Sequence, residues 1–67
     1  MDPVVIYRTF NQAEVQLIRS RLEGAGIEAE VQNEQSASNL AGVGEFRIVV
    51  PGESAEDAQT LLRDIRS

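Results

Sequence analysis

The stretch FNQAEVQLIRSRLEGAGI, residues 10–27, carries signals for both ends of one helix and decides how the chain on either side must run. At its start Asn11 is a favourable N-cap residue, and the Glu14 carboxylate can accept a hydrogen bond from the Asn11 amide, which would complete a capping box. Phe10 and Val15 occupy the two positions of a hydrophobic staple. These signals predict a helix that begins directly after Asn11.

The same stretch predicts where this helix ends. Gly26 can adopt the left-handed conformation that terminates many helices, and Ile27 would then fold back onto Leu22 in a Schellman motif. Between the two ends, apolar residues recur along one helical face. The members of this predicted face are Ala13, Val15, Leu17, Ile18, Leu22 and Ala25.

Strand patterns lie on both sides of the helix. PVVIYRT at residues 3–9 is rich in β-branched and aromatic residues, and IEAEVQN at residues 27–33 alternates apolar with polar residues. EFRIVVP at residues 45–51 is a third strand pattern, after which Ser54 and Asp57 suggest the capping box of a second helix. The apolar face of that helix consists of Ala58, Leu61, Leu62 and Ile65.

The predicted order is β-α-β-β-α within a single domain, residues 1–67. A right-handed β-α-β unit makes the first two strands parallel, and the third strand fits between them in the antiparallel sense. The expected fold class is therefore α+β, a truncated ferredoxin-like domain with a three-stranded sheet of order 1-3-2 and two helices on one face. Because the chain stops before the fourth strand of that fold, the first strand is expected to form an apolar sheet edge.

Composition excludes several kinds of chemistry. The 67 residues include no Cys and no His, and all six basic residues are arginines, so disulfides, thiolate or imidazole metal ligands and lysine nucleophiles are ruled out. We therefore expect no enzyme activity and no cofactor. The net charge of −5 disfavours nucleic acid as a partner, and the apolar runs are too short to cross a membrane. A cytoplasmic protein is the expectation.

Nearly the whole chain resembles a family of short bacterial proteins described as putative prokaryotic signal-transducing proteins. The segments YRTFNQAEVQLIRSRLEGAGIEAEVQNE and RIVVPGESAEDAQTLL carry this resemblance. The recurring features are Tyr7-Arg8-Thr9, Glu14, Leu17-Ile18, Leu22, Gly26-Ile27, Asn33-Glu34, Val50-Pro51 and the stripe Ala58, Leu61 and Leu62. The resemblance implies a regulatory role and a fold similar to that of the P-II nitrogen regulators.

The sequence departs from those regulators in the loop between the second and third strands. In the regulators this loop carries a modified tyrosine, whereas residues 34–44 here contain no Tyr. The chain also lacks a counterpart of their nucleotide-binding glycine motif. The resemblance to the regulators thus extends to topology alone.

A candidate binding site lies at the end of the sheet where the first two strands finish. Because these strands are parallel, their carboxyl ends and the N-terminus of the first helix should lie together, and helix N-termini favour anions. The residues expected to gather there are Arg8, Thr9, Asn11, Asn33, Glu34, Ser36, Ser38 and Asn39. They would bind a small polar or anionic ligand, or a protein partner, through the loop at residues 34–44. The alternative is structural, with Asn11 only capping the helix and Arg8 pairing with Glu34.

Two further possibilities concern the sheet itself. Glu28, Glu30 and Glu45 could offer oxygen ligands to a hard cation, but a solvated face with Arg47 paired to one of them across the hairpin explains the same residues. We therefore assign no metal site. The alternative function is assembly, in which a homodimer or larger oligomer forms through the first strand or through the open face of the sheet.

Overall fold

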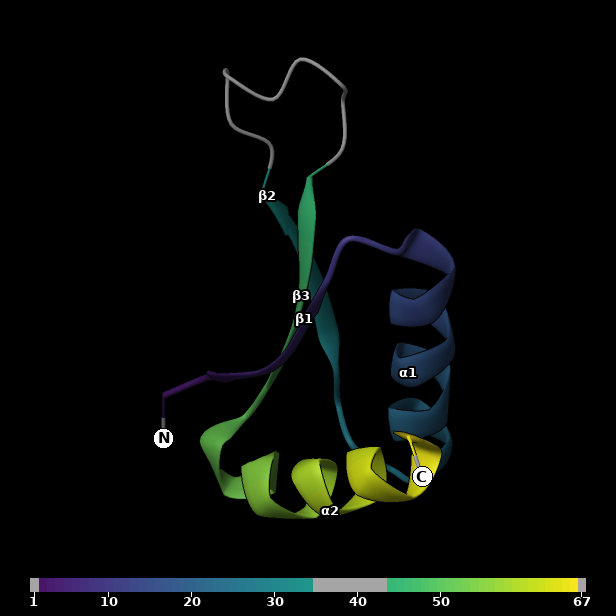
Figure 1. Ribbon diagram of the computed structural model, residues 1–67. Helices are drawn as coiled ribbons and strands as arrows, with labels where there is room; N and C mark the ends of the chain where they lie inside the picture. Colours follow the sequence, from purple (N-terminus) through teal and green to yellow (C-terminus); the bar gives the residue numbers. More distant parts are fainter. Residues whose placement is uncertain (1, 35–43, 67) are drawn as a thin grey trace.

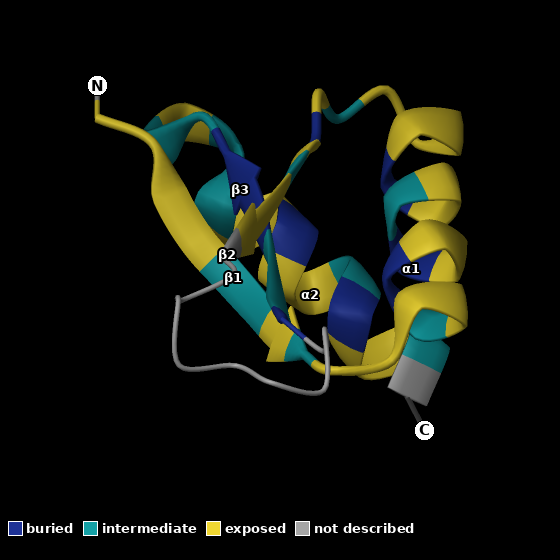
Figure 2. Ribbon diagram, turned by 90° about the horizontal axis from the view of Figure 1, so that it is seen from above, coloured by how far each residue is buried: buried dark blue, intermediate teal, exposed yellow. Residues whose placement is uncertain are grey.

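The computed structural model describes residues 2–34 and 44–66 and contains three strands and two α-helices in the order predicted (Figure 1). The elements are β1 (Val4–Thr9), α1 (Gln12–Gly24), β2 (Glu30–Glu34), β3 (Glu45–Val50), a 3-10 turn (Gly52–Ser54) and α2 (Ala55–Arg66). The strand order is β1-β3-β2, and β3 is antiparallel to both neighbours. The two helices lie on one side of the sheet and leave its other side open (Figure 2). The predicted fold class and sheet order are confirmed.

A β-bulge in β1 sets which side chains of that strand face the helices. Val5 pairs with Val49 and Tyr7 pairs with Ile48, so Ile6 has no partner residue in β3. Directly paired residues share a face of the sheet, and regular alternation from Val5 would have placed Tyr7 on the open face. The extra residue instead places Tyr7 beside the buried Ile48, on the helix-covered face.

The hydrophobic core lies between this covered face and the two helices. Ile48 and Val50 of β3 are completely buried, and the helix residues around them are almost completely buried. The helix members of the core cluster are Val15, Ile18, Leu22, Ala58 and Leu62. α1 packs chiefly on the central strand β3, whereas α2 packs on β1 and on α1.

The core-facing stripe of α1 is narrower than predicted. Its buried side chains are Val15, Ile18 and Leu22. The remaining members of the predicted face, Ala13, Leu17 and Ala25, are exposed. A three-stranded sheet offers a narrow surface, and α2 occupies part of it, so only one row at i, i+3 and i+7 reaches the core.

The end of α1 is the Schellman motif that the sequence predicts. The Ile27 amide donates to the Leu22 carbonyl at 2.9 Å and the Gly26 amide donates to the Glu23 carbonyl at 3.0 Å. Gly26 has a φ of 83°, in the left-handed region. Because this motif holds Ile27, β2 begins at Glu30 and not at residue 27 as predicted.

The start of α2 differs from the prediction as well. Ser54 does not follow a turn as a simple N-cap but lies within the 3-10 turn that leads into α2. Its amide donates to the Pro51 carbonyl at 2.8 Å. Such 3-10 turns are common at helix ends, where they supply acceptors for amides that have no partner within the helix.

Gly26 and Gly24 make a matched pair for testing the helix end. A Cβ at either position meets no atom within 4 Å, but Gly26 alone of the two has a left-handed φ. We expect Gly26→Ala to lower the free energy of unfolding by about 1 kcal/mol, because a Cβ strains that conformation. Gly24→Ala should leave stability unchanged or raise it by about 0.5 kcal/mol, because alanine restricts the unfolded chain. Urea unfolding measures both, and equal effects of the two changes would contradict this account.

Candidate functional site

The candidate site lies at the end of the sheet where β1 and β2 finish and β3 begins, which we call the loop end. Phe46 of β3 pairs with Thr9 on one side and with Asn33 on the other. These three residues therefore form a row across the sheet, and Phe46 packs against the core on the helix-covered face. The topology thus places Thr9 and Asn33 on one face, two strand spacings or about 10 Å apart.

Thr9 and Asn11 are engaged in starting α1. The Asn11 side-chain oxygen accepts a hydrogen bond from the Glu14 amide at 3.1 Å, as predicted for an N-cap residue. The Asn11 amide donates to the Thr9 hydroxyl oxygen at 3.1 Å. The predicted capping box is therefore wrong in one respect, because Thr9 takes the place assigned to the Glu14 carboxylate. That carboxylate instead accepts a hydrogen bond from the Tyr7 hydroxyl.

Arg8 reaches the same end of the sheet on its opposite face. It pairs with Arg47, and strand alternation puts this pair on the open face, away from Thr9. The backbone of Glu34 pairs with that of Glu45 at the same end. The structure therefore divides the predicted site residues between two faces. Ser36, Ser38 and Asn39 lie outside the described residues.

The open face carries mixed charges near the loop end. Arg47 Nε lies 3.4 Å from Glu45 Oε1, so Arg47 pairs along β3 with one of the three acids considered for it. The side chains of Glu45 and Arg47 keep about a third and a quarter of their surface exposed, so the pair stabilises the fold by well under 1 kcal/mol.

Phe10 is the feature of the loop end that the sequence interpretation missed. It was predicted to pack on Val15 as a hydrophobic staple, but Phe10 is 65% exposed while Val15 is completely buried in the core. Because Thr9 and Asn11 are joined by a hydrogen bond around it, the turn holds Phe10 outside the sheet. The sequence could not distinguish these two outcomes, because Phe10 occupies the same position in the pattern whether its ring packs as a staple or stays exposed.

A second exposed apolar residue lies elsewhere. Leu17 of α1 is 52% exposed and borders a hollow of about 600 Å³ between α1 and α2, together with Leu61 and Ile65. This hollow is open, and it belongs to the helix side of the molecule, away from the loop end. Leu17 is therefore a useful reference residue for the role of Phe10.

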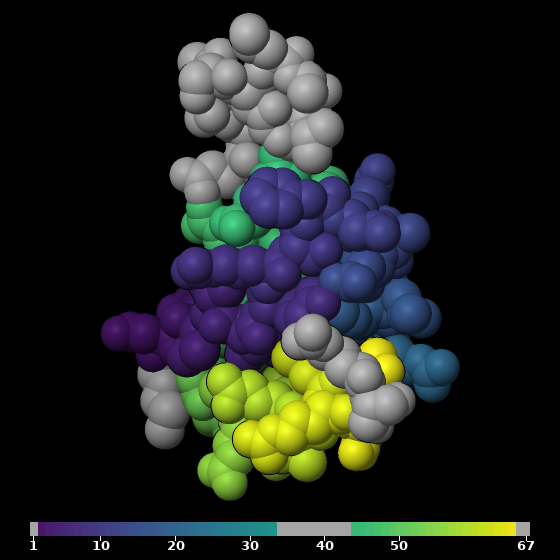
Figure 3. Space-filling model, in the orientation of Figure 1, coloured from purple at the N-terminus to yellow at the C-terminus, as the bar shows by residue number. Residues whose placement is uncertain are grey.

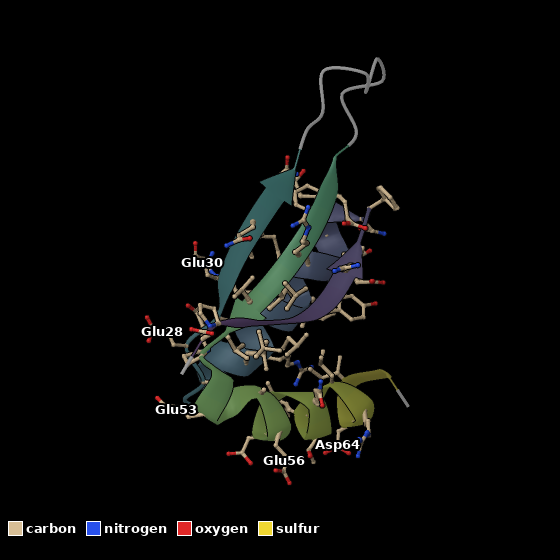
Figure 4. The ribbon with its side chains drawn as sticks, turned by 90° about the vertical axis from the view of Figure 1, so that its left-hand side faces the viewer. Glu28, Glu30, Glu53, Glu56 and Asp64 are labelled. Carbon is tan, nitrogen blue, oxygen red and sulfur yellow. The ribbon has the colours of Figure 1, made fainter. Side chains whose placement is uncertain are left out.

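The acidic side chains are dispersed over the surface. In Figure 4, Glu28 and Glu30 lie along the β2 side of the sheet, whereas Glu53, Glu56 and Asp64 lie along the 3-10 turn and α2. Within residues 2–34 and 44–66, no three acidic side chains are grouped closely enough to hold a metal ion. In the same part of the chain, neither helix has the length and apolar character needed to span a bilayer.

Comparison with protein families gives one match. The model of the family described as "Putative prokaryotic signal transducing protein" matches residues 4–66, which is almost the entire chain. Comparisons with curated proteins and with solved structures gave no match.

The N-cap at the loop end can be tested separately from any binding role. Asn11→Ala removes the oxygen that accepts from the Glu14 amide and should lower the free energy of unfolding by about 1 kcal/mol. Asn11→Asp keeps an acceptor at this position and should retain most of the stability. Chemical denaturation provides the comparison. An Asn11→Asp variant as unstable as Asn11→Ala would contradict the capping role.

Proposed function

The chain belongs to the family described as "Putative prokaryotic signal transducing protein", and we propose that it acts in signal transduction as a non-catalytic module that binds a protein partner at the loop end. The proposed surface combines the exposed Phe10 with Asn33, which lies across Phe46 at the same end of the sheet, and with the segment at residues 34–44. Family membership supports the signalling role, and the exposure of Phe10 is the observation that supports the place and kind of binding.

An exposed aromatic side chain favours a protein partner over a small polar ligand. Phe10 is 65% exposed, so its ring adds little to the core and can be covered without unfolding. Aromatic residues are enriched in the buried centres of protein interfaces, where a few anchors supply most of the binding free energy. Polar side chains at the same end of the sheet, here Asn11 and Asn33, suit the rim of an interface.

The chemistry available at this end supports binding without catalysis. The chain has no His, Cys or Lys to act as a general base or nucleophile at neutral pH. The hydroxyls and amides near Phe10 serve the helix start, since Thr9 accepts from Asn11 and Asn11 accepts from Glu14. These groups hold the backbone turn that carries Phe10.

We propose that the segment at residues 34–44 contributes to the same surface. It begins directly after Asn33 of β2 and ends directly before Glu45 of β3, so the chain enters and leaves it at the loop end. Hairpin connections usually have about two to five residues, and longer ones often carry a function. The proposal therefore treats this segment and Phe10 as parts of one contact area.

Replacement of Phe10 tests the proposal. A partner is first captured by crosslinking from cells that make the protein, then purified and titrated against variants of this chain. Phe10→Ala should weaken binding at least tenfold, roughly the loss of an aromatic anchor, while changing stability little. Leu17→Ala removes a comparably exposed apolar side chain on the helix side and should leave the affinity within about twofold of wild type.

A deletion within the segment at residues 34–44 provides a second test of the proposed function. Deletion of residues 36–43 should preserve the fold, because it leaves every core residue of the described part of the chain in place, and should abolish binding of the same partner. Undiminished binding by both the deletion variant and Phe10→Ala would overturn the proposal.

A further inference from the structure

The two edges of the sheet differ in their charge patterns. The β1 edge has one acid before it and one base near its end, Asp2 and Arg8, and the residues between them are uncharged. The β2 edge has an acid at each end, Glu30 and Glu34. When a strand pairs antiparallel with an identical strand, its beginning lies beside the partner's end. The β1 pattern then brings opposite charges together, whereas the β2 pattern brings like charges together.

The β1 edge is also apolar and accessible. Val4 and Val5 are 36% and 38% exposed, which makes them two of the four large hydrophobic residues most exposed in the described part of the chain. In Figure 3, β1 lies at the surface facing the viewer, with α1 beside it and α2 below. Sheets commonly protect an edge with charge in the middle of the strand. Residues 3–7 of this edge carry none.

The charges at the two ends of β1 have no partners among the described residues. Asp2 and Arg8 are both exposed, and neither forms an ion pair in residues 2–34 and 44–66. Arg8 moreover lies directly beside Arg47 on the neighbouring strand, and like charges at paired positions destabilise a sheet. An acid brought next to Arg8 from outside would offset this repulsion.

We propose that β1 is an interaction edge for a second copy of this chain, which pairs with it antiparallel about a two-fold axis near Val5 and Ile6. Each copy would then place its Asp2 near the Arg8 of the other, and the exposed valines of both copies would pack side by side. The result is one continuous sheet of two three-stranded halves. This surface is separate from Phe10, so the inference stands whether or not the loop end binds a partner.

The same features favour a second copy over an unrelated strand. A two-fold interface requires a surface that is complementary to itself, and the acid-to-base order along β1 meets this requirement. The bulge at Ile6 opposes pairing to some extent, because bulges twist an edge away from a flat partner. The pairs of Asp2 with Arg8 of the other copy, one at each end of the interface, would offset this effect of the bulge. They also provide a specific test.

Charge reversal at the two ends of β1 tests the proposal by sedimentation equilibrium. With rising concentration the wild type should approach twice the monomer mass of 7.3 kDa. Asp2→Arg and Arg8→Asp should each raise the dimer dissociation constant about tenfold, because each places like charges at both ends of the interface. The double variant Asp2→Arg/Arg8→Asp should return to the wild-type value.

Mixing the two single variants gives the most specific readout. Asp2→Arg has two bases on the β1 edge and Arg8→Asp has two acids, so an equimolar mixture should form a heterodimer with near wild-type affinity. Asp57→Arg and Arg63→Asp, at exposed positions on α2, are the matched controls and should leave dimerisation unchanged. Circular dichroism checks that every variant is folded.

Three results would overturn the inference. They are a wild type that stays monomeric at millimolar concentration, single β1 variants that dimerise like wild type, and a mixture that dimerises no better than its components. Loss of partner binding by Phe10→Ala leaves all three measurements unaffected, so failure of the inference and failure of the proposed function are distinguishable.

Discussion

The position of β3 between β1 and β2 is the constraint on which the rest of the structure depends. As the central strand it supplies hydrogen-bond partners to both neighbours, and it contributes the completely buried Ile48 and Val50 to the core. Both side chains belong to the core cluster that residues of α1 and α2 complete. In a domain of 67 residues one small core must stabilise every element, so the strand that pairs with both neighbours and supplies these side chains governs the fold.

The arrangement of β1 follows from its pairing with β3. The bulge at Ile6 shifts the alternation by one residue, so Tyr7 faces the helices and its hydroxyl can donate to Glu14 of α1. The same shift assigns Arg8 to the open face and Thr9 to the covered face. Thr9 then lies where its hydroxyl can accept from the Asn11 amide and help to start α1. A single extra residue thus positions both the helix and the polar groups around it.

The surfaces available for interaction consist of residues that neither fill the core nor make the hydrogen bonds at the start of α1. Thr9 and Asn11 have hydrogen bonds to make within the chain, whereas Phe10 between them has no place in the core and stays outside. At the sheet edges, antiparallel self-pairing would bring like charges together on β2 and opposite charges together on β1. We propose the loop end as a contact for a different protein and the β1 edge as a contact for a second copy.

Much of the fold could be predicted from the sequence, because the relevant interactions are local. Cap residues determined that α1 starts after Asn11 and ends before Gly26, hydrophobic periodicity determined the element types, and the ferredoxin-like arrangement predicted the sheet order. What only the tertiary structure decided were features that depend on partners distant in the chain: the bulge at Ile6, the division of Arg8 and Thr9 between two faces, and the exposure of Phe10. Each depends on the register between β1 and β3 or on the width of the sheet beneath α1. The physical reason is that neighbouring residues specify a local conformation, whereas the face and burial of a side chain depend on how separate segments of the chain pack against one small core.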